Sequence, residues 1–504
     1  MAGRTTLSGT GDEPTAIHML SLILWVPFFG AVLVALLPAA QHRLIRGIAL
    51  FHAGLALILS WSLLARFDGG RAALQFVEQV VWSSTIGVSY ALGVDGLSLP
   101  MVLLATLLAT VALLASDRVT AGAKGYHAWL LVLEFAMLGV FMAQDWSLFF
   151  MFWELTLIPL FFLIDLWGGK KRHAASLSFV LYTMGGSIFI LIAVIMAYRL
   201  TPEHSFAMAA IAKAAALLPR DEQVWLLLAF LVGFGVKIPI FPLHGWLPLA
   251  HVEAPSPVSV LLSGVLLKMG AYGLLRVVGI LPEATLLLQP LLVGIALVSI
   301  LYGGLLAWRQ TDLKAMIAYS SVSHMGVVLL GIATLNEVGL LGAVMQMVAH
   351  GLIAGALFLL IGLLYERTHT RELADYGSLV RVTPRFAFLI TLALLAGMGM
   401  PGLAGFVAEL HVLLGGFARW GWLMVLASLG VLMSAAYAVR TIGGLFAGPV
   451  RPELAQLQDL RPLELAAAVP LVAGLLALGL KPAPVIALAS AKVAELAAIF
   501  TRLP

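Results

Sequence analysis

The segment GFGVKIPIFPLHGWLP, residues 233–248, places a lysine and three prolines in an apolar run. A proline inside a helix removes a backbone hydrogen bond and clashes with the preceding turn. In lipid, the freed carbonyl groups need partners from protein or water. The segment therefore predicts a membrane helix that breaks beside Lys237, where water or polar groups reach the backbone.

Similar apolar runs fill the rest of the chain. Of 504 residues, 62% are hydrophobic and 11% are charged, whereas about a quarter of the residues of a soluble domain are charged. We therefore predict an all-α polytopic membrane protein with about fourteen transmembrane helices of about 20 residues each. The expected spans are 19–38, 45–65, 96–115, 127–143, 146–167, 174–199, 224–249, 256–278, 285–308, 312–334, 338–366, 384–416, 421–448 and 463–481.

These spans use nearly the whole chain and leave no room for a soluble catalytic domain. The chain has no cysteine, which excludes disulfides and iron–sulfur clusters held by its own thiolates. GMGMPG at 397–402 matches a dinucleotide-binding fingerprint, but that motif needs a preceding strand and here lies inside a span. There is also no Walker motif, so we do not expect ATP to drive this protein directly.

Lysine and arginine predict the orientation, because they accumulate in loops on the inner side of a membrane. Most of them lie in six loops at 41–46, 116–125, 168–173, 309–314, 367–385 and 448–462. With these loops inside, both termini lie on the outer, positive side. The polar tail at 1–18 lacks the layout of a cleavable signal peptide.

Few ionisable side chains lie inside the spans. A charge at the bilayer centre costs at least about 2.5–3.5 kcal/mol, so each needs a partner or a task. A buried lysine next to a carboxylate can load and release a proton as the pair forms and breaks. A histidine carries protons near neutral pH, or only bonds a backbone carbonyl, and both interpretations stay open. The candidate relay residues are Glu154, Lys237, Lys268, His324, His350 and Glu409.

Four further ionisable residues lie in or near the spans. Glu134 has a structural or a functional role, and the sequence does not decide between them. Asp165 is interpreted as an interfacial acid paired with the basic loop GGKKRH, and Arg276 lies near a helix end. Asp95, in GVDGLSLP, is interpreted as a helix N-cap.

A second broken span, AGMGMPGLAGFVAEL at 396–410, carries Glu409 close to its break. Interrupted segments at matched positions of two halves indicate inverted repeats around an ion site. We therefore expect two five-helix repeats, in which helices 7 and 12 are broken. The expected divisions are a polar tail at 1–18, helices 1–3 in 19–126, the repeats in 127–278 and 285–448, and a last helix with a short C-terminal tail in 449–504.

Five stretches resemble the antiporter-like subunits of respiratory complex I (NADH-quinone oxidoreductase), most of all the chain M, or subunit 4, type. The resemblance runs from about residue 90 to about residue 445. It rests on LFFMFWELTLIPLFFLIDLWGGKKR, KIPIFPLHGWLPLAHVEAPSPVSVLLSGVLLKMGAYGLLR, QTDLKAMIAYSSVSHMGVV, VAHGLIAGALFLLIGLLYERTHTR and MPGLAGFVAEL.

By position, the resemblance implies that Glu154 of helix 5 pairs with Lys237 of helix 7, and that Lys268 is the central lysine of helix 8. An acid at the break of helix 12 favours the chain M type, because the L and N types carry lysine there. The remaining relay positions, in helices 10 to 12, fall on His324, His350 and Glu409.

One position departs from the family pattern. The family has an acid after WLP, where this chain has Leu249. His244, His251 and Glu253 lie nearby and serve either proton access or capping of the loop. The sequence leaves both roles, proton access and capping, open for these three residues.

The resemblance implies a proton-translocating subunit of NADH:quinone oxidoreductase in the bacterial plasma membrane, driven by quinone reduction elsewhere in the complex. It implies no cofactor in this chain, with iron–sulfur clusters, FMN and quinone in other subunits. The expected partners are the L-type and N-type neighbours and the lipid bilayer, without nucleic acid. The alternative is a subunit of a multisubunit Na⁺/H⁺ antiporter or of a membrane-bound hydrogenase. A passive scaffold is disfavoured by the cost of its buried charges.

Overall fold

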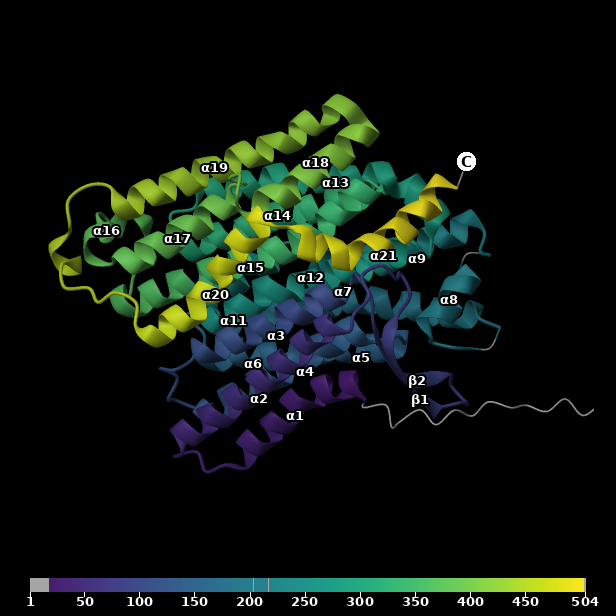
Figure 1. Cartoon of the computed structure of the whole chain (residues 1–504), viewed down its shortest axis with the longest axis horizontal. Helices are drawn as coiled ribbons and strands as arrows, with labels where there is room; N and C mark the ends of the chain where they lie inside the picture. The colour runs from purple at the N-terminus through teal and green to yellow at the C-terminus, as the bar shows by residue number, and fades with distance from the viewer. Residues whose placement is uncertain (1–17, 203, 216, 503–504) are drawn as a thin grey trace, which may run out of the picture.

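The chain forms an elongated bundle of long helices (Figure 1). The computed structural model describes residues 18–202, 204–215 and 217–502, so the tail expected at 1–18 lies outside them apart from His18. Twelve helical segments of this described part are long and apolar enough to cross a membrane. The helical membrane class is thus confirmed, whereas the number of spans and the inverted repeats stay predictions.

The helices follow the expected apolar runs closely. The first part comprises α1 (Met19–Leu36), α2 (His42–Ser62), α3 (Leu99–Leu114), α4 (Ala123–Met142), α5 (Trp146–Leu155), α6 (Leu157–Trp167), α7 (Arg172–Leu200), α8 (Met208–Ala215), α9 (Arg220–Lys237), α10 (Trp246–Glu253), α11 (Ser256–Leu261) and α12 (Leu267–Val278). The second part comprises α13 (Pro282–Arg309), α14 (Leu313–Ala333), α15 (Glu337–Thr368), α16 (Leu379–Val382), α17 (Pro384–Gly397), α18 (Ala404–Trp420), α19 (Met424–Phe446), α20 (Pro462–Leu480) and α21 (Ala483–Thr501).

Short turns of other helical types join these elements. One π-helical turn, Leu262–Leu266, links α11 to α12 without a break in the span. Such turns are rare and frequently mark functional sites. The 3₁₀ turns are Leu63–Ala65, Leu373–Asp375, Gly421–Leu423 and Pro452–Leu454.

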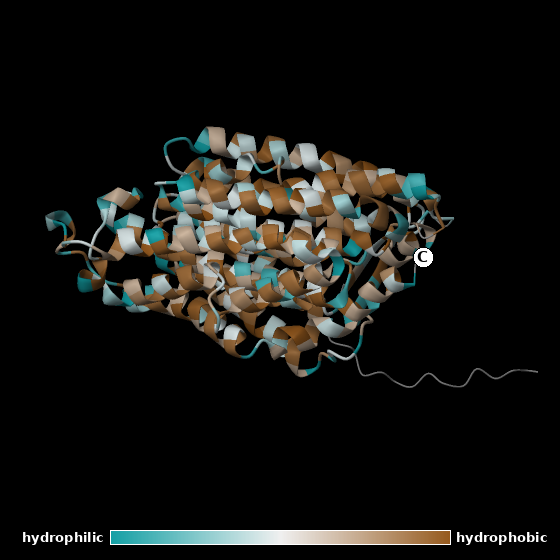
Figure 2. Cartoon of the chain, turned by 90° about the horizontal axis from the view of Figure 1, so that it is seen from above, coloured by the Kyte–Doolittle hydropathy of each residue, from teal (hydrophilic) through white to brown (hydrophobic). Residues whose placement is uncertain are grey.

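Burial separates two kinds of helix. α7 presents large apolar side chains outward, such as Leu181 and Ile188, which are 70% and 55% exposed. In contrast, the most apolar stretches of Ser256–Val278 and of α15 are wholly buried. Figure 2 shows hydrophobic ribbon along the flanks of the bundle and hydrophilic segments mostly at its ends. The flanks therefore suit lipid or other membrane proteins, and the buried helices form the core.

The two ends of the bundle differ. One, here called the basic end, carries the loops 37–41, 115–122, 168–171, 310–312, 369–383 and 447–461, which include the arginine-rich and lysine-rich loops. The opposite hairpin end carries β1 (Gln75–Ser83) and β2 (Val88–Val94), paired antiparallel. This hairpin is an addition to the expected all-α fold. Its valine-rich strands follow the β-branched preference of pleated structure, and most β1 side chains are exposed.

The C-terminal residues correct the expectation of a short tail, because they form α21. Its length and composition would suit a membrane span, but its contacts lie along the hairpin end. A Cβ placed on Gly69, Gly96 or Gly279, in three loops of that end, would touch Ala487, Leu488 or Leu496 of α21. We therefore place α21 across the hairpin end, beside the strands (Figure 1).

Candidate functional site

The first broken helix places Lys237 at a helix terminus. α9 ends at Lys237, and two carbonyl groups of its last turn find partners inside the break. Gly235 O accepts from Ile240 N at 3.1 Å, and Val236 O accepts from Trp246 Nε1 at 2.9 Å. The negative end of the helix dipole favours a cation at this place.

The second broken helix carries an acid close to its break. α17 ends at Gly397, and Glu409 lies in the second turn of α18, which begins at Ala404. Gly399, between the two helices, has φ +73°, and a Cβ there would lie 2.4 Å from Glu409 Oε2. The turn therefore needs glycine, and its backbone packs directly against the carboxylate.

Lys237 is 1% exposed and lies among aromatic rings. Its ammonium donates to Thr156 Oγ1 at 3.4 Å. It also lies 5.3 Å from the centre of the Trp153 ring and 5.6 Å from that of Phe179. Sequence reasoning missed Thr156, although a hydroxyl two residues after Glu154 in an apolar span was a usable signal.

Glu154 lies near Lys237 but does not form the expected ion pair. Within the described residues, no nitrogen–oxygen contact of 4.0 Å or less joins the two side chains. The Glu154 side chain is partly buried, and its Oε1 is buried without a hydrogen-bond partner. The helix passes from α5 to α6 at Thr156, and this hydroxyl takes the contact with the lysine. The structure therefore holds the pair open.

Lys268 makes the shortest contact between relay residues. Its ammonium donates to Ser263 O at 2.6 Å and lies 2.8 Å from His350 Nδ1. Ser263 belongs to the π-helical turn, whose wider backbone exposes carbonyl groups. The Ser263 hydroxyl in turn lies 3.0 Å from the Ser321 hydroxyl of α14. Lys268 is thus held between its own span and α15.

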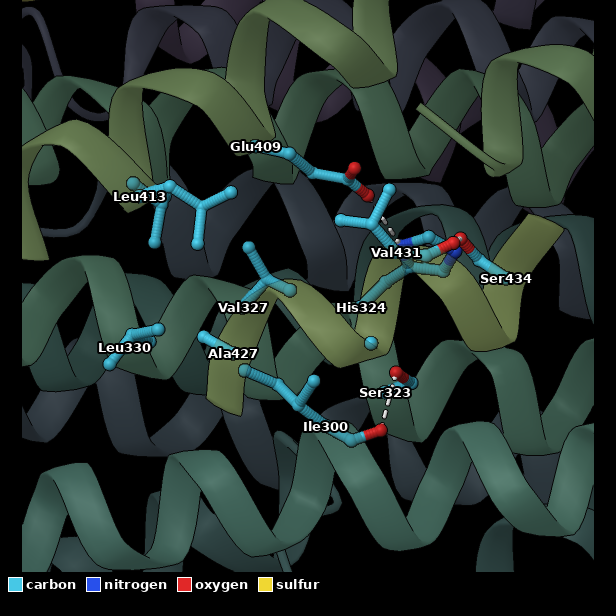
Figure 3. Close-up of a pocket in the computed structure, with 12 residues that line it drawn as sticks. Ile300, Ser323, His324, Val327, Leu330, Glu409, Leu413, Ala427, Val431 and Ser434 are labelled. Atoms are coloured by element: carbon cyan, nitrogen blue, oxygen red, sulfur yellow. Dashed lines mark hydrogen bonds and ion pairs between the residues drawn. The ribbon is translucent and has the colours of Figure 1, made fainter. Parts of the chain in front are cut away.

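His324 and Glu409 form the second direct contact, in the pocket of Figure 3. His324 Nδ1 lies 3.5 Å from Glu409 Oε1, and its Nε2 lies 3.3 Å from Tyr437 Oη. Gln346 Nε2 lies 3.3 Å from His324 Nδ1. The pocket has a volume of about 20 Å³, which is room for one water molecule. Tyr437 comes from α19, and sequence reasoning missed it.

The relay residues form a series with gaps. The ring centres of His350 and His324 are 5.4 Å apart, with no direct hydrogen bond between these two described side chains. His350 Nε2 is buried, and no hydrogen-bond partner for it lies in the described part of the chain. Proton transfer between the two rings would need a water molecule or a small side-chain movement. The same holds between Lys237 and Lys268.

The other ionisable residues have separate surroundings. Both oxygens of Glu134 are buried without partners within the described chain, so its role stays open. Asp165 accepts from His173 Nδ1 at 2.6 Å and from the Ser176 hydroxyl at 2.9 Å. This contact agrees with an interfacial acid paired with the basic loop, because His173 is the last residue of GGKKRH.

Leu249 lies within α10, a short helix rather than the expected loop, and its neighbours are one capping group and two histidines whose side chains make no hydrogen bond among the described residues. Glu253 Oε2 accepts from Lys171 N at 2.8 Å, which fixes the loop at the basic end. His251 is buried against the Phe358 ring at 4.5 Å, and neither ring nitrogen has a partner among the described residues. His244 stacks on Phe241, 5.9 Å between ring centres. Glu253 thus caps the loop, and the role of the histidines stays open.

Asp95 differs from its expected role as an N-cap. The residue that precedes α3 is Ser98, and Asp95 Oδ1 accepts from Leu97 N and Ser98 N in the turn before it. Asp95 also forms an ion pair with Arg276, which the sequence analysis did not predict. The two residues are 181 positions apart, and the sequence carries no signal for the contact.

A helical membrane bundle with buried acids, lysines and histidines in series defines an ion-translocating membrane protein. The family model described as "NADH:quinone oxidoreductase/Mrp antiporter, TM" matches residues 143–434. The chain belongs to this family.

Relatives with known names match over nearly the whole chain. Chain 4 1 of the NAD(P)H-quinone oxidoreductase of Picosynechococcus sp. is 41% identical over 483 residues, which cover 92% of this chain and 89% of the relative. The corresponding chain of Synechococcus elongatus is 43% identical over 479 residues and covers 92% and 88%.

Two solved structures have the same fold. A chain of respiratory complex I from Thermus thermophilus with bound NADH has a TM-score of 0.88 at 33% identity, covering 95% of this chain and 99% of that one. A chain of the Mrp complex from Dietzia sp. has a TM-score of 0.82 at 24% identity and covers 94% and 52%. At that identity, the second likeness concerns the fold alone.

Proposed function

We propose that this chain is the chain 4-type, proton-translocating membrane-arm subunit of an NAD(P)H:quinone oxidoreductase of the complex I type. The relatives that carry this name match it along nearly their whole length. The Thermus complex I chain has the same fold at 33% identity. As a subunit, the chain takes part in the oxidoreductase and translocase activity of a multisubunit assembly in the membrane.

The observation that carries the mechanism is the contact between Lys268 Nζ and His350 Nδ1 at 2.8 Å. A hydrogen bond of this length allows a proton to pass from the ammonium to the imidazole nitrogen. His350 then passes a proton across the 5.4 Å between ring centres to His324, with one water or a ring rotation. His324 lies 3.5 Å from Glu409, which receives the proton.

The Glu154–Lys237 pair drives the relay. With the pair open, Lys237 lacks a carboxylate partner in a buried site, and its charged form is disfavoured, so it releases a proton toward Lys268. When Glu154 moves to Lys237, the pair favours the protonated lysine and reloads it. The partial exposure of Glu154 allows a neighbouring subunit to shift it when quinone is reduced elsewhere in the complex.

The loops at the basic end lie on the inner side, which places both termini on the outer side, where the proton is released. L-type and N-type antiporter-like subunits pack beside this chain. Iron–sulfur clusters, FMN and quinone belong to other subunits. The membrane is the energy-transducing membrane, the plasma membrane in a bacterium.

A Na⁺/H⁺ antiporter subunit is the second candidate, because the matching family model also covers the Mrp antiporters. Na⁺-dependent proton exchange in vesicles that lack NADH would favour it. NADH-driven proton uptake that does not depend on Na⁺ favours the complex I subunit.

The test of the proposed function uses the assembled complex in sealed vesicles. We expect Glu154→Ala and Lys237→Ala to remove this chain's share of the NADH-driven proton uptake while the complex still assembles. Glu222→Gln, at an exposed acid on the first turn of α9, is the control and leaves uptake unchanged. Full pumping by the Glu154→Ala complex would sink the proposal.

A further inference from the structure

A buried ion pair outside the relay lies at the hairpin end of the span that carries Lys268. Arg276 Nη1 lies 2.5 Å from Asp95 Oδ2, and Arg276 Nη2 lies 2.9 Å from Asp95 Oδ1. Asp95 is fully buried, and the Arg276 side chain is 11% exposed. A bidentate pair of this kind fixes the guanidinium in one orientation.

The pair follows Lys268 along one side of the helix. Lys268, Tyr272 and Arg276 are spaced four residues apart, one helical turn each, so their side chains share a face. Arg276 Nη2 donates to Tyr272 Oη at 2.9 Å, and Tyr272 Oη donates to Phe141 O at 3.2 Å. From Lys268 toward the hairpin end, Tyr272 and Arg276 are thus the polar side chains of this face.

These groups cannot pass a proton on toward Lys268. A guanidinium has only donors, stays charged and cannot accept a proton. The Tyr272 hydroxyl donates to a carbonyl, so its proton is not available for transfer. A proton or hydronium ion that approaches from the hairpin end therefore meets the Asp95 carboxylate, whose two oxygens the guanidinium occupies, and then a fixed positive charge rather than a group that passes the proton on to Lys268.

α21 covers the pair from outside the bundle. A Cβ placed on Gly96, next to Asp95, would lie 2.3 Å from Leu488 O of α21. Lys492, one turn further along α21, forms an ion pair with Glu495 at 2.9 Å. Against the effect of burial, its charge adds to that of Arg276 in lowering the pKa of Asp95. The helix that the sequence analysis expected to be a tail thus closes the hairpin end above Arg276.

We propose that Arg276, oriented by Asp95 and covered by α21, is a barrier that prevents protons from leaking from the hairpin end back to Lys268. The inference rests on the proposed function for the direction of the leak. Arg276 is a positioning and blocking residue and does not carry the pumped proton. Repulsion between like charges is stronger in a protein interior than in water, and the guanidinium therefore opposes the approach of a hydronium ion even though Asp95 offsets part of its charge.

The competing explanation is that the ion pair is purely structural. It predicts a different ranking of the variants by their rate of proton leak. For a structural pair, removal of either partner leaves a buried charge or an unfilled bond, and replacement of both by neutral, hydrogen-bonding side chains restores the fold. For the barrier, the charge at position 276 decides the leak, whether or not Asp95 is present.

The experiment measures passive proton entry into vesicles that contain the assembled complex, without NADH, after acidification of the side that faces the hairpin end. We expect Arg276→Gln and the double variant Asp95→Asn/Arg276→Gln to raise the rate at least about tenfold. Arg276→Lys and Asp95→Asn keep a positive charge at position 276, so we expect their rate of passive proton entry to equal that of the wild type. Lys213→Gln, on the exposed face of α8 at the same end, is the control.

Two results would overturn the barrier: an assembled double variant as tight as the wild type, or an Arg276→Lys complex as leaky as Arg276→Gln. Because the leak is measured without turnover, its result does not depend on pumping. Normal pumping by Glu154→Ala would contradict the proposed function, whereas a tight double variant contradicts only the barrier.

Discussion

The ammonium of Lys268 lies 2.8 Å from Nδ1 of His350, so two buried groups that both bind protons share one hydrogen bond. The lysine comes from the span with the π-helical turn and the histidine from the middle of α15. Burial of both side chains keeps bulk water out of the contact. The geometry lets one proton occupy either group, which is what a relay step needs.

Replacement of His350 tests this contact from the acceptor side. We expect His350→Leu to lower this chain's share of the NADH-driven proton uptake by about tenfold or more, because no acceptor remains for the Lys268 proton. His127→Leu is the matched control, since His127 is also buried and bonds only Ala123 O within α4. Normal uptake by the His350→Leu complex would show that the proton bypasses α15.

A methyl group at Gly399 tests the position of the Glu409 carboxylate. The added Cβ of Gly399→Ala would lie 2.4 Å from Glu409 Oε2, so the carboxylate must move away from His324. We expect a large loss of proton uptake with assembly retained. Gly402→Ala carries the same kind of backbone strain, at φ +91°, but its Cβ meets nothing within 4 Å. Equal losses in the two variants would assign the effect to strain alone.

Removal of the Thr156 hydroxyl tests whether the open state of the Glu154–Lys237 pair contributes to the coupled rate. Thr156→Val removes the oxygen that receives the Lys237 ammonium at 3.4 Å and keeps the side-chain shape. A hydrogen bond to a charged group contributes about 1.5–3 kcal/mol, so we expect the coupled rate to fall by about tenfold. Thr183→Val, at a buried hydroxyl that bonds Phe179 O, should leave the rate unchanged.

The ion pair at the hairpin end predicts that the contribution of Asp95 to the free energy of unfolding does not change between pH 8 and pH 5. Burial opposes ionisation of Asp95, yet the Arg276 charge and hydrogen bond keep the pKa of Asp95 below its usual value. The carboxylate therefore stays charged from about pH 8 to pH 5, well above its usual pKa of about 3.9. Its contribution to the free energy of unfolding is present above that value and is lost as the pH falls through the lowered pKa. The melting temperature of the purified complex should therefore show no step between pH 8 and 5 that depends on Asp95, and a step near pH 6 that Asp95→Asn abolishes would contradict this assignment.

The sequence predicted the features that follow from apolar length and from proline and glycine. The broken helices beside Lys237 and Glu409 needed only the cost of unpaired backbone groups in lipid. The contacts between distant segments were not predictable in this way. Tyr437 meets His324 across 113 positions, and Arg276 meets Asp95 across 181.

Other differences have local physical reasons. The π-helical turn contains no proline, so nothing in its residues marks it. α21 begins directly after Pro482, which favoured a tail, and its packing on the hairpin-end loops, which the sequence does not show, sets its course. The Glu154–Lys237 pair was expected closed, because attraction between opposite charges was weighed without the competing hydroxyl of Thr156.

The central claim is that the pumped proton passes through Lys268. The most direct measurement is the number of protons taken up per NADH oxidised by an assembled Lys268→Met complex in sealed vesicles, compared with the wild type. We expect the number of protons per NADH to fall by this chain's share, because methionine fills the same space as lysine but carries no proton. An unchanged number of protons per NADH in the Lys268→Met complex would contradict it.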